Sequence, residues 1–76
     1  MTDSERIAFF ERQAEQAYSE MYDATSPSDA AARYSDAKEA LYSAIGLAKS
    51  LKQDETAQRL EARRAEIKAV FRSQFS

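Results

Sequence analysis

The chain contains no cysteine, no histidine and no tryptophan, and it has one glycine and one proline among its 76 residues. Without cysteine and histidine, disulfides, zinc sites and the common Ser–His and Cys–His catalytic centres cannot be built. A single glycine cannot supply a glycine-rich loop that binds phosphates. The sequence therefore predicts a protein that is not an enzyme and that holds no metal and no cofactor.

Long apolar runs are also missing. No segment approaches the roughly 20 consecutive apolar residues of a membrane-spanning helix. The first five residues, Met1 to Glu5, are polar and acidic, unlike a secretory signal. The length suits one domain, residues 1–76, at a size where a single core is barely sufficient. We expect a soluble cytoplasmic protein without a membrane span.

Apolar and alanine residues recur at spacings of three and four, which is the period of one helix face. The clearest stripe comprises Tyr34, Ala37, Leu41, Ala44, Ala48 and Leu51. Similar stripes precede and follow it, and strand signals are absent. We therefore predict helices over residues 3–24, 27–52 and 54–74. Short connections make neighbouring helices antiparallel, so the predicted fold is all-α, an up-down-up three-helix bundle.

Helix-start signals support these boundaries. Thr2 and Glu5 have the spacing of a capping box. Ser26 followed by Pro27 is typical of a helix N-cap and first helical residue. Asp54 is predicted to cap the third helix. Gly46 falls inside the second helix, where we expect it to mark a close helix crossing.

Charge is distributed unevenly although the net charge is only −2. Residues 1–39 carry nine acids and four bases, whereas residues 40–76 carry four acids and seven bases. An acidic first helix packed against a basic third helix would explain this, and so would a basic surface that binds an acidic partner. Arg64 lies within the apolar stripe of the third helix, and its guanidinium is expected to reach Glu11 or Glu15.

A basic ridge on the third helix is the second interpretation of that charge. Arg64, Lys68 and Arg72 follow one another at spacings of four, so they lie on one face and could follow phosphates. Nucleic-acid binding is one alternative function on this basis. The acidic net charge and the interruptions at Glu61 and Glu66 argue against it.

One segment resembles known helical families. The pattern Tyr34-x-x-Ala37-x-x-x-Leu41-x-x-Ala44-Ile45-x-Leu47 resembles the middle of a tetratricopeptide repeat. The window from Tyr34 to Phe75 is also similar to the last two helices of a microtubule-interacting-and-transport domain. In both families these positions pack a helical hairpin. The resemblance implies a groove that accepts a short peptide or helix, although no binding residue of either family transfers to this chain.

Fifteen of the apolar residues are alanine, so bulky side chains are scarce and contact surface is expected to be left for another polypeptide. The sequence predicts a non-catalytic module that binds a protein or peptide partner in a groove between helices. The candidate contact residues are Leu47, Leu51, Leu60, Arg63, Ile67 and Val70. Self-association into a homodimer, burying Phe9, Tyr22, Tyr42 and Phe75, is the alternative.

Overall fold

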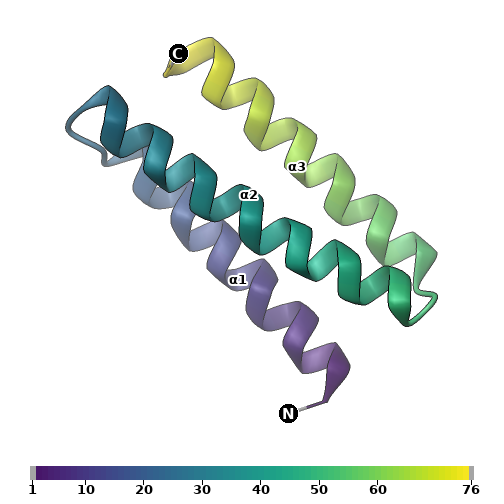
Figure 1. The fold of residues 1–76 in the computed structure, drawn as a ribbon. Coiled ribbons are helices and arrows are strands. Elements are labelled where there is room, and N and C mark those ends of the chain that lie inside the picture. Colours follow the sequence, from purple (N-terminus) through teal and green to yellow (C-terminus); the bar gives the residue numbers. More distant parts are fainter. Residues whose placement is uncertain (1, 76) are drawn as a thin grey trace.

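The computed structural model describes residues 2–75, which form three helices joined by short loops. These helices are α1 (Asp3–Tyr22), α2 (Pro27–Ser50) and α3 (Asp54–Gln74). Successive helices run in opposite directions, so the chain goes up, down and up again (Figure 1). The all-α three-helix prediction is confirmed. The first two helices end two residues earlier than predicted, and the first and last residues of the predicted domain lie outside the described part.

Side-chain caps fix the starts of the first two helices. The Thr2 hydroxyl accepts a hydrogen bond from the Glu5 amide at 3.2 Å, and the Glu5 carboxylate accepts one from the Thr2 amide at 3.2 Å. The Ser26 hydroxyl accepts from the Asp29 amide at 3.1 Å. The expectation for α3 was wrong, because Asp54 is the first helical residue and Gln53 takes the cap position without a side-chain hydrogen bond.

The turn between α2 and α3 has a left-handed residue. Lys52 has a φ of 60°, a conformation that favours glycine over residues with a Cβ. The Gln53 amide donates to the Ala48 carbonyl at 2.9 Å, and the Lys52 amide donates to the Lys49 carbonyl at 3.0 Å. This pair of hydrogen bonds is a Schellman motif, which satisfies the last carbonyls of α2 and turns the chain into α3.

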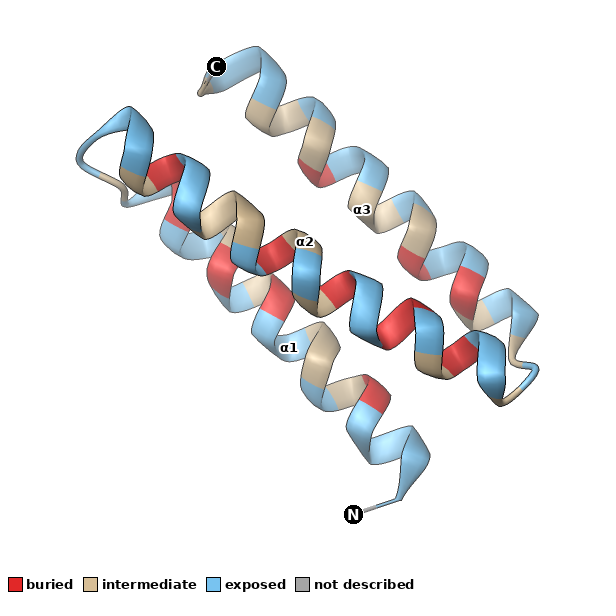
Figure 2. Ribbon diagram, in the orientation of Figure 1, coloured by how far each residue is buried: buried red, intermediate tan, exposed pale blue. Residues whose placement is uncertain are grey.

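The core lies along α2, which is the central helix of the three (Figure 1). Buried residues form a stripe on each helix (Figure 2). Leu41, Leu60, Ile67 and Met21 are the largest fully buried side chains. The helix pair α1–α2 has the more extensive contact, and α3 packs less extensively on α2. Alanines explain this difference in part, because Ala14 on α1 and Ala37 on α2 are both fully buried and small side chains allow close approach.

Two ion pairs connect α1 to α3. Arg59 contacts Glu11, and Arg63 contacts Glu15. Both pairs join residues that are 48 apart in sequence, so α1 and α3 run parallel. The proposed packing of an acidic first helix against a basic third helix is therefore found, through these side chains rather than through a close backbone contact.

Gly46 does not mark a helix crossing, contrary to the sequence-based expectation. It is exposed, and a Cβ built on it would meet no atom within 4 Å. None of the described helices combines the length and the hydropathy needed to cross a lipid bilayer.

Replacement of Gly46 by alanine is expected to stabilise the protein. The substitution Gly46→Ala adds a methyl group in open space and raises helix propensity, so the free energy of unfolding should rise by about 0.5–1 kcal/mol. Urea unfolding followed by circular dichroism measures the change. A loss of stability would show that another group packs closely against Gly46, contrary to the open space found around it.

Candidate interaction grooves

Two of the predicted apolar contact residues belong to the core. Leu60 is fully buried and Ile67 is 1% exposed, so neither can contact a partner in this conformation. Leu47 and Leu51 are half-buried and pack against the same core, and Val70 is half-buried on α3. The continuous apolar groove expected from these residues is therefore not present, because the hydrophobic stripe of α3 faces α2.

Arg63 was expected at the rim of a partner site, but it is held within the chain. Its Nε and Nη2 atoms each donate to the Glu15 carboxylate at 2.7 Å. Its guanidinium also lies over the Tyr18 ring, 4.9 Å from the centroid, and pairs with Glu66 at 3.6 Å. The hydrogen bonds from Arg63 lower the pKa of Glu15, against a smaller opposing effect of burial. Arg63 therefore links α1 to α3.

The Arg63–Glu15 pair is expected to make stability fall in acid. The folded-state pKa of Glu15 lies below its ordinary value of 4.5, so its contribution is complete above that pH and disappears as the pH falls through the folded pKa. Both side chains are partly exposed, which limits the contribution to about 0.5–1 kcal/mol.

Urea midpoints measured from about pH 6 down to about pH 3 test this contribution. Glu15→Gln should lower stability at the upper pH and should flatten the acid dependence. Glu39→Gln is the matched control, because Glu39 is exposed and belongs to no ion pair among residues 2–75. Equal pH profiles for the wild type and Glu15→Gln would contradict a stabilising role for the pair.

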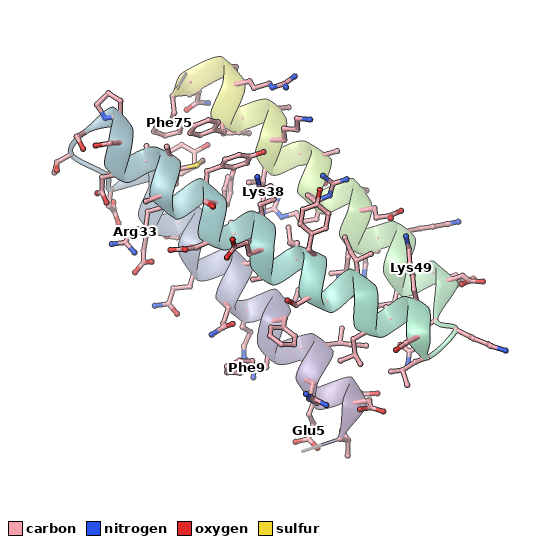
Figure 3. All side chains as sticks on the ribbon, in the orientation of Figure 1. Glu5, Phe9, Arg33, Lys38, Lys49 and Phe75 are labelled. Atoms are coloured by element: carbon pink, nitrogen blue, oxygen red, sulfur yellow. The ribbon has the colours of Figure 1, made fainter. Side chains whose placement is uncertain are left out.

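A groove between α2 and α3, which we call the basic groove, has a volume of about 450 Å³. Residues of both helices form its walls. They are Tyr34, Lys38 and Tyr42 from α2, and Arg64, Lys68, Phe71 and Arg72 from α3. The three members of the predicted basic ridge therefore lie together, joined by a fourth cation and three aromatic rings that the sequence analysis did not assign to the site. Figure 3 shows Lys38 on the α3 side of α2.

Most of this positive charge is not neutralised by the chain. No carboxylate of residues 2–75 forms an ion pair with Lys38, Arg64 or Lys68. The acids of α3 that are nearest in sequence pair with other residues: Glu66 lies 3.6 Å from Arg63, and Glu61 lies 3.0 Å from Lys49. Like charges four residues apart on a helix are mildly destabilising, so the arrangement of Arg64 and Lys68 has a cost.

The expected contact of Arg64 with Glu11 or Glu15 is not formed, because Arg59 and Arg63 occupy those carboxylates. Arg64 instead turns toward α2. Its guanidinium lies 4.8 Å from the centroid of the Tyr42 ring, and Nη1 donates to the Tyr42 hydroxyl at 3.2 Å. The Arg64 Nε is buried and donates no hydrogen bond to the described residues.

Aromatic stacking orders one end of the basic groove. The rings of Tyr34 and Phe71 are nearly parallel, with centroids 4.3 Å apart. The Lys38 ammonium lies 5.7 Å from the centroid of the Tyr34 ring. Stacked rings and cation–π contacts hold cationic side chains in place without removing their charge. The groove is therefore an ordered positive surface with aromatic walls.

A second groove, between α1 and α2, has the opposite charge. Its volume is about 470 Å³. Its walls comprise Phe10, Gln13, Gln16, Ala17 and Glu20 from α1, and Asp36, Glu39, Ala40 and Ser43 from α2. Arg33, on the side of α2 away from Lys38, lies 3.9 Å from Glu20 and 3.8 Å from Asp36 (Figure 3). The acids of this groove are thus partly neutralised, whereas Lys38, Arg64 and Lys68 of the basic groove form no ion pair within residues 2–75.

Comparison with protein family models, with curated proteins and with solved structures finds no match. The resemblance to tetratricopeptide and microtubule-interacting-and-transport helices therefore remains a prediction. Within residues 2–75, no group of three or more acidic side chains is arranged to hold a metal ion. What the site offers chemically is positive charge, hydrogen-bond donors and aromatic surface.

Proposed function

We propose that the protein is a non-catalytic interaction module that binds an acidic segment of a partner protein in the basic groove. The observation that supports this most directly is the unneutralised charge of Lys38, Arg64 and Lys68 within one hollow. Charge complementarity increases the rate of association and selects acidic partners. The sequence predicted that the partner peptide binds against the apolar stripe of α3. We propose instead that it binds on the side of α3 that carries the basic ridge.

The shape of the groove and the short extent of its positive charge favour a polypeptide over a nucleic acid. The groove runs between two antiparallel helices, which suits a helix or an extended segment. Its positive charge is local, because Arg59 and Arg63 are paired with carboxylates of α1 and do not extend it. A nucleic acid that makes several phosphate contacts needs a longer basic track.

Fluorescence anisotropy with a labelled peptide tests the proposal. The probe is a short amphipathic helical peptide with glutamates along one face, and its control replaces those glutamates with glutamine. The glutamate peptide should bind, and its affinity should fall as salt is added, whereas the glutamine peptide should bind far more weakly. A labelled single-stranded oligonucleotide that bound more tightly than the glutamate peptide would favour the nucleic-acid alternative.

Charge reversal within the groove is expected to abolish most of that affinity. Lys68→Glu replaces an unpaired cation by an anion beside Arg64 and Arg72, so binding should weaken by about tenfold or more. Lys52→Glu is the matched control, because it makes the same change in net charge outside the groove. Equal losses in the two variants would show that only overall charge matters and would contradict a site in the groove.

Self-association is the second candidate, since Phe9, Tyr22 and Tyr42 are 39%, 48% and 52% exposed. Phe9 and Tyr22 lie 13 residues apart on α1, which is about 20 Å along the helix, so they do not form one patch. Sedimentation of the wild type and Tyr42→Ala at micromolar concentration distinguishes the candidates. A dimer that Tyr42→Ala dissociates would make the groove a contact between copies.

A further inference from the structure

The polar groups that line the basic groove all carry hydrogen-bond donors. They are the ammonium groups of Lys38 and Lys68, the guanidinium groups of Arg64 and Arg72, and the hydroxyls of Tyr34 and Tyr42. No carboxylate of residues 2–75 lines the groove. The Tyr42 hydroxyl accepts from Arg64, and its own proton has no acceptor among residues 2–75. A group rich in acceptors and in negative charge would complement this surface.

Arg64 also carries a hydrogen-bond donor that lacks an acceptor, and this donor is buried. Its Nε is enclosed and makes no hydrogen bond to the described residues, and a buried donor without a partner is costly. Arg64 lies in the apolar stripe of α3, where a leucine would be expected to pack without this cost. The positive charge is therefore kept at a position where it does not serve the packing of the core.

We propose that the acidic segment bound in the basic groove carries a phosphate monoester, such as phosphoserine. This inference rests on the proposed function and names the anion that the groove selects. A phosphate monoester bears a charge of about −1.5 to −2 near pH 7 and has three strong acceptor oxygens, whereas a glutamate bears one charge and two oxygens. The groove has three cations, Lys38, Arg64 and Lys68, that form no ion pair within residues 2–75, and together they match the higher charge better.

The placement of the donors also suits a phosphate. Lys38 and Tyr42 approach from α2, while Arg64 and Lys68 approach from α3, so donors face the hollow from two walls. A tetrahedral group can accept hydrogen bonds from several directions at once, whereas the acceptors of a carboxylate lie in one plane. Arginine is well suited to phosphate, because its planar guanidinium can donate two parallel hydrogen bonds.

A phosphorylated peptide fits the surroundings better than a nucleic acid does. Beyond the groove the positive charge is neutralised within a short distance, since Lys49 is paired with Glu61 and Arg63 with Glu15. A single anionic group flanked by peptide can use the charge and the aromatic walls together. A chain of phosphodiesters would meet these neutralised regions on either side.

Three peptides of identical sequence test the inference. The central residue of a short alanine-rich helical peptide is serine in one, glutamate in the second and phosphoserine in the third. Binding is measured by isothermal titration calorimetry. The phosphoserine peptide should bind about tenfold more tightly than the glutamate peptide, and the serine peptide should bind most weakly.

The pH dependence of binding provides an independent readout. The second ionisation of the phosphate has a pKa of about 6, whereas lysine, arginine and tyrosine side chains ordinarily titrate near pH 10 or above. The chain has no histidine, and none of the carboxylates in the described part of the chain lines the groove. Affinity for the phosphoserine peptide should therefore rise as the pH increases from about 5 to about 7, while affinity for the glutamate peptide should change little over that range.

Variants locate the phosphate contact. Arg64→Lys keeps the charge but loses the planar donor, and Tyr42→Phe removes one hydroxyl. Each should reduce the preference for phosphoserine over glutamate, the first by about tenfold and the second by a few fold. Arg6→Gln, which removes a charge at the start of α1, is the control and should leave the preference unchanged. Thermal melts confirm that each variant is folded.

The outcomes separate the two proposals. Equal affinities for phosphoserine and glutamate peptides, with no pH dependence, would overturn the phosphate inference and leave an acidic-partner module standing. Failure of both peptides to bind would remove both. Tighter binding of a single-stranded oligonucleotide, lost in Arg64→Lys, would overturn the assignment to a phosphorylated peptide.

Discussion

Leu60→Ala is expected to lower the free energy of unfolding by about 3 kcal/mol, within the 2 to 5 kcal/mol range for large-to-small substitutions in cores. Leu60 is fully buried between α3 and α2, so the shortened side chain loses apolar contacts and leaves a cavity. A chain of 76 residues is expected to have only about 4–11 kcal/mol of stability in total. The variant should therefore melt at a much lower temperature, and part of it could already be unfolded near 37 °C.

Chemical unfolding followed by circular dichroism at 222 nm measures this loss. Leu51→Ala is the control, because Leu51 is half-buried at the end of α2 and should lose less than half as much. The comparison also tests the role of Leu60. If Leu60→Ala kept wild-type stability while losing a peptide ligand, Leu60 would contact the partner, as the sequence first indicated, and the packing of α3 on α2 would be wrong.

Periodicity predicted the architecture well because each helix buries one narrow stripe. The positions Ala37, Leu41 and Ala44 repeat at helical spacing, and all three are fully buried. Capping chemistry placed the starts of α1 and α2, since the Thr2 and Ser26 hydroxyls satisfy backbone amides that a helix leaves free. These signals are local, so one sequence is sufficient to find them.

The end of α2 was harder to predict. A left-handed residue ends the helix there, and glycine is the usual signal for such a turn. The chain has lysine at that position, Lys52, while its only glycine lies in the exposed middle of α2. No glycine therefore marks the boundary, the helix predicted over residues 27–52 extends two residues too far, and the backbone hydrogen bonds of the turn reveal where α2 ends.

The different contacts made by the arginines of α3 could also be found only from the structure. Arg63 and Arg64 are neighbours in sequence and point about 100° apart around the helix. A stripe on one helix identifies its inward face, but it does not say which neighbouring helix flanks each edge. Here Arg63 faces α1 and is neutralised by Glu15, while Arg64 faces Tyr42 on α2. The basic groove follows from that difference.

The substitution Ala37→Leu is expected to cause the second large loss of stability, because it disturbs the packing of α1 on α2. Ala37 is fully buried, and Ala14 of the adjoining helix is fully buried as well. Three extra carbon atoms at this position must either force the helices apart or distort side chains, at a cost of about 1–3 kcal/mol. The change should lower the melting temperature and should separate α1 from α2 more than α2 from α3.

Ala32→Leu is the matched control for this substitution. Ala32 lies on the same helix but is exposed, so leucine there changes helix propensity very little and meets no packed neighbour. Hydrogen exchange measured by NMR should show faster opening of α1 in Ala37→Leu and unchanged protection in Ala32→Leu. If Ala37→Leu were as stable as the wild type, α1 and α2 would be further apart than in this structure, and alanine would not be the cause of their close approach.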